Sequence, residues 1–293
     1  MTSVKASVIV PVYNDPNGIR TTLESLLDQQ FDSYEIIPVD NNSTDATADV
    51  IHDLATAHPE RIRPCAEREI QSSYAARNTG IEHATGDVLL FLDADMWVED
   101  SWVEDLVWAL ETRGCEYIGC HVEVVTSENP NFPERYEHGL SFPVESYLTE
   151  KRFAPTCALA VKRNVITEVG SFDARLISGG DKEFGQRVYR AGFDQGYADS
   201  VTAYHPARSS YSALISKAIR IGRGRAQLHR YHPQMAGPHL LHPVHFLPPN
   251  PRRLAQECTG TSGTLLDLPG FYMLEFGLKL VQAVSSLQER VAG

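Results

Sequence analysis

Residues 87–95 read DVLLFLDAD, an apolar run long enough for one buried strand that ends in two carboxylates, Asp93 and Asp95, one residue apart. In open α/β sheets, ligands bind just beyond the carboxyl ends of the strands, so this run predicts a binding site at its end. Because the chain turns there, one carboxylate can face a sugar hydroxyl and the other a hard divalent cation that bridges phosphate oxygens. Asp-x-Asp alone is a weak signal, since turns after strands are rich in aspartate for backbone reasons.

Strand and helix patterns alternate around this run and indicate the fold class. Apolar runs typical of strands lie at 6–10, 35–39, 62–65, 88–92, 117–125 and 157–161, and helical spacing occurs at 18–30, 73–84, 99–113 and 182–191. Such alternation predicts βαβ units, an α/β fold and a largely parallel sheet. Ser43 is the expected cap of a helix after the second strand. Residues 126–156 are rich in Pro, Asn, Glu and Tyr without a clear period, which predicts a long irregular connection.

Composition narrows the class of protein. The 293 residues suffice for one large α/β domain or for one domain with an appendage. A net charge of -12 argues against a generic nucleic-acid binder, which needs a cationic surface. The five cysteines are scattered and form no Cys-x-x-Cys pair, as expected for reduced thiols in a cytosolic protein. With neither a signal segment nor an apolar run of about 18 residues, we expect a cytoplasmic protein without a membrane-spanning helix.

Five motifs follow one another between residues 6 and 210. They are Ser7–Asn14 (SVIVPVYN), Val39–Asp45 (VDNNSTD), Ala76–Gly80 (ARNTG), Phe91–Asp95 (FLDAD) and Gly179–Gly185 (GGDKEFG). In this order they resemble the motifs of family 2 glycosyltransferases, and the ordered set is far more specific than any single member. The resemblance implies a GT-A fold, which is Rossmann-like with a mostly parallel central sheet flanked by helices. It also implies a nucleotide-sugar-binding and catalytic domain over residues 1–210 and a basic, amphipathic helical extension over residues 211–293.

The resemblance implies a chemistry as well. Such an enzyme moves a sugar, with inversion, from a UDP- or GDP-linked donor to a hydroxyl, and uses Mg²⁺ or Mn²⁺ to stabilise the leaving diphosphate. The implied donor-binding residues are Pro11, Tyr13, Asp40, Arg77, Asn78 and Asp93, and the implied metal ligands are Asp95 and His205. Asp40 would accept from the base, Tyr13 would line its pocket, and Arg77 would offer planar donors to phosphate or base oxygens. The alternatives are structural: Asp40 and Asp45 serve the following turn, Arg77 is a surface helix residue, and His205 makes only local hydrogen bonds.

Asp181 is the implied general base, which removes the proton of the acceptor hydroxyl in a single displacement. Members of the family usually carry a Glu-Asp pair at this place, and this chain has Gly180 where the Glu is expected. The departure leaves the base in place and concerns the orientation of the acceptor. The structural alternative for Asp181 is a loop residue that caps the helix expected over 182–191.

The C-terminal region combines basic and apolar residues. The basic positions within an apolar pattern are Lys217, Arg220, Arg223, Arg225 and Arg230. Such a segment suits anionic lipid head groups or a lipid-linked phosphate acceptor. The alternatives are a solvated helix face, or arginine side chains paired with local acidic residues. The apolar-rich stretch over 271–287 predicts an amphipathic helix that lies on a membrane, packs on the core or makes a dimer contact, with packing as the default. Histidines at 229, 232, 239, 242 and 245 lie among prolines without cysteine partners, which disfavours a zinc site.

Three other classes of protein compete with this interpretation. A sugar nucleotidyltransferase needs a Gly-rich loop after the first strand, where this chain has Pro11–Asn14 instead. A dehydrogenase needs Gly-x-Gly-x-x-Gly after a strand, which the sequence lacks. A catalytically silent nucleotide-sugar-binding or scaffold protein has Gly180 as its only support. We therefore expect a metal-dependent inverting glycosyltransferase that uses a glycan or lipid-linked acceptor, contacts the cytoplasmic membrane face peripherally and binds no nucleic acid.

Overall fold

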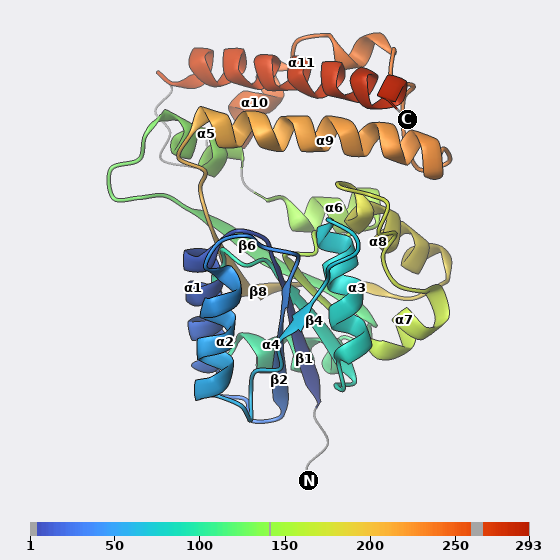
Figure 1. Ribbon diagram of the computed structural model, residues 1–293. Helices are drawn as coiled ribbons and strands as arrows, with labels where there is room; N and C mark the ends of the chain where they lie inside the picture. Colours follow the sequence, from blue (N-terminus) through green and yellow to red (C-terminus); the bar gives the residue numbers. More distant parts are fainter. Residues whose placement is uncertain (1–4, 141, 259–265, 293) are drawn as a thin grey trace. The chain divides into compact units, whose positions relative to one another are not determined.

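One mixed sheet organises the first part of the chain in this computed structural model, which describes residues 5–140, 142–258 and 266–292 (Figure 1). Within those residues it has eight strands in the order β3-β2-β1-β4-β7-β6-β8-β5. The strands are β1 (Ala6–Val12), β2 (Tyr34–Asp40), β3 (Cys65–Ala66), β4 (Val88–Leu92), β5 (Trp97–Val98), β6 (Tyr117–Val125), β7 (Ala158–Lys162) and β8 (Gln195–Pro206). The helices are α1 (Pro16–Leu27), α2 (Thr47–Ala57), α3 (Ser73–His83), α4 (Trp102–Thr112), α5 (Phe132–Leu140), α6 (Val144–Lys151), α7 (Arg163–Val169), α8 (Gly180–Arg190), α9 (Tyr211–Tyr231), the 3-10 turn η1 (Pro243–His245), α10 (Pro251–Cys258) and α11 (Leu268–Ala292).

The described residues fall into two compact units. Unit 1 contains the chain up to Glu123, Pro143–Ala174 and Gly180–His205, and therefore most of the sheet. Unit 2 contains Val124–Phe142, Arg175–Gly179 and the chain from Pro206 onward. Segments that precede residue 211 thus belong to unit 2, together with the C-terminal helices.

The centre of the sheet is parallel. Strand β1 lies between β2 and β4 and runs parallel to both, with Ile9 opposite Ile37 on one side and Phe91 on the other. All residues of β1, β2 and β4 are buried, as expected for parallel strands covered on both faces. Strands β4 and β7, β7 and β6, and β5 and β8 pair antiparallel. The predicted α/β class is therefore confirmed, with a parallel half and an antiparallel half.

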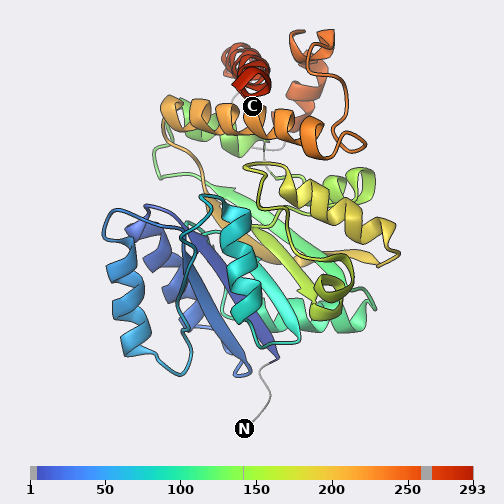
Figure 2. The ribbon, with the colours of Figure 1, turned by 45° about the vertical axis from the view of Figure 1, so that its right-hand side comes forward.

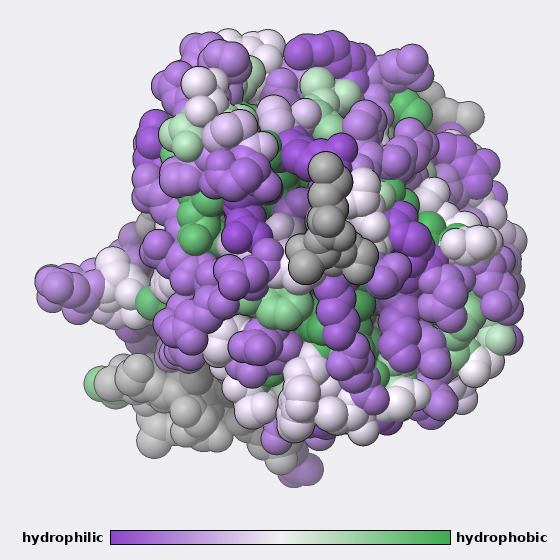
Figure 3. Space-filling view, turned by 90° about the horizontal axis from the view of Figure 1, so that it is seen from below, coloured by the Kyte–Doolittle hydropathy of each residue, from purple (hydrophilic) through white to green (hydrophobic). Residues whose placement is uncertain are grey.

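Helix α3 packs on β1 and β2, where it covers the parallel half of the sheet (Figure 2). An added Cβ at Gly80 would lie 2.4 Å from Ile9 Cγ2, so the glycine lets the helix come close to the strand. Strand β1 begins near the N-terminus at the bottom of Figure 1. Seen from that side, hydrophilic residues cover most of the surface and hydrophobic residues form small separate patches (Figure 3). The candidate residues of the sequence analysis follow the opposite, carboxyl ends of the strands.

Three local predictions were wrong. Helix α2 begins at Thr47 with Ala46 at its cap and no side-chain cap bond, while the Ser43 hydroxyl accepts from the backbone N–H of Asn14 at 2.9 Å. The Ser43 hydroxyl thus links the turns after β1 and β2. The expected irregular connection over 126–156 contains helices α5 and α6. The third strand is β3, and Ile62 makes only an isolated bridge to Ile36.

Unit 2 is built on the packing of α9 against α11. An added Cβ at Gly222 would lie 2.3 Å from the backbone oxygen of Gln282, so the helices are in backbone contact there. The apolar core residues of this unit are Tyr136, Leu214, Ala218, Leu254, Phe271 and Leu278. The C-terminal amphipathic stretch thus packs on a core, as expected. No helix in the described ranges is apolar over enough of its length to cross a membrane.

A buried carboxylate links α5 to α9 in unit 2. Glu137 accepts from the Lys217 ammonium at 2.8 Å and from the Arg208 guanidinium at 3.0 Å. Burial alone would raise the pKa of Glu137, but Lys217 and Arg208 outweigh it and hold the pKa at about 2. Both cations need this partner, because an unpaired buried charge is costly.

Replacing Glu137 by Gln should therefore destabilise the protein by about 3 kcal/mol, since it leaves two cations without their carboxylate. Because the folded pKa lies below the unfolded value, the contribution is present above about pH 4.5 and is lost as the pH falls toward 2. Urea unfolding at pH 7 and pH 3 measures both effects. Glu128→Gln, which changes an exposed residue of the same unit, is the control. Equal stabilities of the two variants at pH 7 would contradict the assignment.

Candidate active site

The candidate residues gather at the carboxyl ends of the parallel strands. Tyr13 follows β1, Asp40 ends β2, and Asp93 and Asp95 follow β4. This edge is where open α/β sheets bind their ligands. All four residues belong to unit 1.

Helix α1 holds the Asp-x-Asp loop. The buried Thr22 hydroxyl donates to the backbone oxygen of Met96 at 2.6 Å. An added Cβ at Gly18 would lie 2.5 Å from the backbone oxygen of Ala94, so the first turn of α1 touches the loop directly. Thr22 and Gly18 therefore position the two aspartates. Neither residue was predicted to support the site. The only sign of this role in the sequence is the glycine at position 18, at the start of a helical pattern.

Arg77 and Asp93 form an ion pair at the end of β4. Arg77 Nη2 lies 2.5 Å from Asp93 Oδ1, and Arg77 Nη1 donates to the backbone oxygen of Ser73 at 3.3 Å. The Arg77 side chain is 4% exposed, which excludes the alternative of a surface helix residue, whereas that of Asp93 is 39% exposed. Arg77 Nε is buried and has no hydrogen-bond partner among the described residues. Arg77 thus holds Asp93 through one of its two carboxylate oxygens.

Tyr74 connects this ion pair to Asp181. The Arg77 guanidinium lies over the Tyr74 ring, 5.6 Å from its centroid. The Tyr74 hydroxyl accepts from the backbone N–H of Asp181 at 3.4 Å, and the ring stacks on Phe172 at 5.9 Å. Asp93, Arg77, Tyr74 and Asp181 therefore form one chain of contacts across α3 and the start of α8.

The same tyrosine gives a packing reason for Gly180. An added Cβ at Gly180 would lie 2.8 Å from two ring carbons of Tyr74, closer than side chains pack. A glutamate at this position would meet the ring, so the tyrosine and the glycine belong together. Gly180 was recognised in the sequence as a departure from the family pattern, but its contact with Tyr74 was not predicted, because the sequence alone does not show that two residues so far apart are in contact.

Helix α8 is anchored by a second buried pair. Glu183, 2% exposed, binds the Arg187 guanidinium at 2.8 Å. Arg187 in turn donates to the backbone oxygens of Gly170 and Ser171 at 3.0 and 2.8 Å. Asp181 lies in the first turn of this anchored helix, where its Oδ1 accepts from the backbone N–H of Lys182 at 2.9 Å. That contact is local and engages one carboxylate oxygen, but Asp181 lies inside α8, which begins at Gly180, and not in a loop before the helix as the capping alternative expects.

Asp95 and His205 face each other. His205 Nε2 lies 4.0 Å from Asp95 Oδ2, with the imidazole 5% exposed and the carboxylate 40% exposed. Two ligand atoms of one ion are about 3 to 4 Å apart when each metal bond is about 2.1 Å, so this pair fits a shared divalent cation. Carboxylate oxygen suits Mg²⁺ and Mn²⁺. Across the described ranges, no group of three or more His, Cys, Asp or Glu is placed to hold a metal ion.

Acceptor atoms surround the end of β2. Asp40 is 5% exposed, and its Oδ1 accepts from the backbone N–H of Ser43 at 3.0 Å, the turn contact that the structural alternative expects. The neighbouring Asn41 Oδ1 is buried without a hydrogen-bond partner among the described residues. Tyr13, half exposed, follows the adjacent strand. Asp45 binds the Thr47 backbone N–H at 3.0 Å and so serves the start of α2.

Two candidate residues lie inside the structure. Pro11 is a buried residue of β1. Asn78 exchanges hydrogen bonds with the backbone of Phe172, donating from Nδ2 at 2.8 Å and accepting at Oδ1 at 3.0 Å. Asn78 thus holds the loop that carries the Phe172 ring, on which Tyr74 stacks.

Comparisons with known proteins show what this chain is similar to. The sequence model described as "Glycosyl transferase family 2" matches residues 7–176. The glycosyltransferase AglE of Haloferax volcanii is 35% identical over 224 residues, which cover 76% of this chain and 73% of that protein. Matches to three further relatives cover 14%, 54% and 32% of their lengths.

Solved structures show the same fold. The mannosyltransferase PcManGT from Pyrobaculum calidifontis, in complex with GDP-Man and Mn²⁺, superposes with a TM-score of 0.65 at 19% identity. The superposition covers 98% of this chain and 87% of that one. S. aureus TarS in complex with UDP-GlcNAc gives a TM-score of 0.57 at 15% identity, covering 98% and 92% of the two chains.

The packing of Tyr74 on Gly180 predicts the effect of a single methyl group. Gly180→Ala should lower the free energy of unfolding by about 1 to 3 kcal/mol, because the new Cβ forces the ring of Tyr74 to move. Gly277→Ala is the matched control, since nothing lies within 4 Å of an added Cβ at that helical glycine. Denaturant unfolding compares the two. A Gly180→Ala variant as stable as Gly277→Ala would show that the tyrosine does not require the glycine.

Proposed function

The chain belongs to glycosyl transferase family 2 and is a glycosyltransferase with GT-A architecture, and we propose that it transfers a sugar from a UDP- or GDP-linked donor, with inversion and with the help of Mg²⁺ or Mn²⁺. The contacts of Arg77 give the proposal its strongest support. The buried Arg77 directs Asp93 to the edge of the sheet beside Asp95 and is joined through Tyr74 to Asp181. Donor-binding groups and a candidate base are thus parts of one supported arrangement.

The nucleoside would bind at the ends of β1 and β2. Asp40 offers a carboxylate and Asn41 a buried, unpartnered oxygen, and both can accept from the N–H groups on the pairing edge of uracil or guanine. The exposed Tyr13 ring is available to stack on the base. The similar structures that hold GDP-Man and UDP-GlcNAc support a donor of one of these two kinds.

Asp93, held by Arg77, would face the ribose of the donor. Asp95 and His205 would hold the divalent ion, which when bound neutralises charge on the leaving diphosphate. Because these two side chains leave coordination positions open, oxygens of the donor diphosphate are the natural further ligands. Metal binding and donor binding should therefore strengthen each other.

Asp181 would act as the general base. Its carboxylate accepts the proton of the acceptor hydroxyl while the hydroxyl oxygen attacks the anomeric carbon and the diphosphate leaves from the opposite face. The Tyr74 hydroxyl and the Glu183–Arg187 pair hold the helix that carries it. Gly180 was the only support for a catalytically silent protein, and the Tyr74 ring gives that glycine a packing explanation.

We place the binding of the acceptor at the cytoplasmic face of a membrane. Tyr211, Ile215 and Ile219 of α9 are each exposed and recur every four residues, so they form one apolar stripe. Arg220 is also exposed on the same helix. An apolar stripe beside cationic residues suits peripheral contact with an anionic lipid surface, where a lipid-linked or glycan acceptor would be met.

A thermal-shift panel of UDP-, GDP-, dTDP- and CMP-sugars with and without Mn²⁺ tests the donor site. We expect a Mn²⁺-dependent rise in melting temperature with UDP- or GDP-sugars only, because a ligand that binds the folded state stabilises it. Asp95→Ala should abolish the Mn²⁺-dependent part of the shift. Asp87→Ala, at the exposed start of β4, is the control. A shift that Asp95→Ala leaves intact, or Mn²⁺ binding by electron paramagnetic resonance that it leaves intact, would remove Asp95 from the metal site.

Asp181→Asn tests the base separately from the donor site. The amide keeps the shape of the side chain but cannot accept the proton, so we expect transfer to fall by about 10²- to 10⁴-fold while donor affinity stays the same. Single-turnover transfer and calorimetric titration with the donor measure the two quantities. Near-normal transfer would exclude Asp181 from the mechanism.

A further inference from the structure

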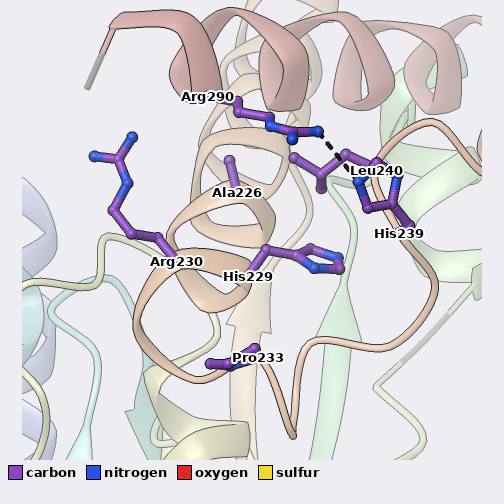
Figure 4. A pocket seen from close by; sticks show the side chains of 7 residues that line it. All are labelled: Ala226, His229, Arg230, Pro233, His239, Leu240 and Arg290. Carbon is purple, nitrogen blue, oxygen red and sulfur yellow. Dashed lines mark hydrogen bonds between the residues drawn. The ribbon is translucent and has the colours of Figure 1, made fainter.

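Unit 2 contains a basic hollow of about 430 Å³ that the proposed transfer does not use (Figure 4). Its lining residues are Ala226, His229, Arg230, Pro233, His239, Leu240 and Arg290. They come from the end of α9, the loop that follows it and the end of α11. Four of the seven carry cationic or titratable nitrogen groups and none is acidic, although the chain as a whole has a net charge of -12.

The side chains around the hollow offer more hydrogen-bond donors than hydrogen-bond acceptors. His239 Nδ1 lies 3.2 Å from the backbone N–H of Leu241, and its Nε2 lies 3.2 Å from Arg290 Nη1. A neutral imidazole accepts at only one nitrogen, so one of these two donors is not satisfied by His239. The Arg230 guanidinium is attracted by the Glu289 carboxylate, whose pKa it helps to lower. A ligand rich in acceptor oxygens would satisfy these groups.

The acidic residue next to Arg290 in the sequence is already bound by other side chains. Both oxygens of Glu289, the residue before Arg290, accept hydrogen bonds, one from Arg223 Nε at 2.8 Å and one from Gln227 Nε2 at 3.0 Å. The positive charge of the hollow is therefore not cancelled by a carboxylate in its lining. The pKa of His229 is lowered by burial and also by the neighbouring His239, His245 and Arg225, as expected where positive groups are crowded.

Apolar side chains lie exposed next to the hollow in the sequence. Leu240 lines it and is buried, whereas Leu241, Val244 and Leu247 are 60%, 40% and 56% exposed. Solvent-exposed apolar residues grouped in so short a segment favour a ligand or surface that is itself partly apolar.

We propose that this hollow binds a phosphate group carried by a lipid. Phosphate offers several acceptor oxygens and no competing N–H donors, and guanidinium groups bind it in bidentate fashion. The exposed segment Leu241–Leu247 would contact the hydrocarbon part. The assignment rests on the proposed function in one respect, namely that the lipid surface is where the acceptor is found.

Calorimetric titration with three probes tests the assignment: dihexanoyl phosphatidic acid, dihexanoyl phosphatidylcholine and inorganic phosphate. We expect the phosphatidic acid to bind at least about tenfold more tightly than the other two, and Arg230→Gln with Arg290→Gln to weaken it about tenfold or more. Arg252→Gln, an exposed arginine of the same unit that does not line the hollow, should leave binding unchanged. Flotation with phosphatidylcholine vesicles containing phosphatidic acid should give the same order of the variants.

Two results would overturn the assignment. Equal affinity for inorganic phosphate and phosphatidic acid would exclude a lipid ligand, and unchanged binding in the double variant would exclude this hollow. Mn²⁺-dependent donor binding, measured on the same proteins, should be the same in all variants. Failure of lipid binding with donor binding intact therefore counts against this inference alone, and loss of donor binding in the unmodified protein counts against the proposed function alone.

Discussion

The buried guanidinium of Arg77 is the constraint on which the arrangement of the site depends. Arginine cannot lose its proton in a protein, so burying it at the end of β4 requires a carboxylate within reach. Asp93 is that carboxylate, and its direction is fixed as a result. The same guanidinium lies over the Tyr74 ring. That ring occupies the space that a side chain at position 180 would need, so the residue there has to be glycine. A single buried charge thus relates the end of β4, at Leu92, to the start of α8, at Gly180.

Much of the fold could be predicted because it depends on local patterns. The buried strands β1, β2 and β4 are recognisable in the sequence as apolar runs, and Asp93 marks the end of the run that forms β4. Ser43 was misassigned as a helix cap because its hydroxyl serves a different turn, that of Asn14. Helices α5 and α6 were missed because both are short, and because α5 buries polar residues such as Glu137, which composition marks as loop-like.

The candidate site also contains residues that the sequence predicts and residues that only the structure reveals. Motif order predicted Asp93, Asp95, Arg77 and Asp181 as site residues, and the three aspartates lie at strand or helix ends. Thr22 and Tyr74 were missed, because each acts through a contact with a residue distant in the sequence. Asn78 was expected at the donor and spends both polar atoms on the Phe172 backbone, so its place in donor binding stays a prediction.

The backbone contact between α9 and α11 restricts how this part of the chain can change in length. Gly222 touches the backbone of Gln282, and Gly224 similarly faces the backbone of Ser178. One residue inserted upstream within α9 would rotate both glycines by about 100° and carry side chains into these positions. A change of length within α9 therefore disrupts two close backbone contacts at once.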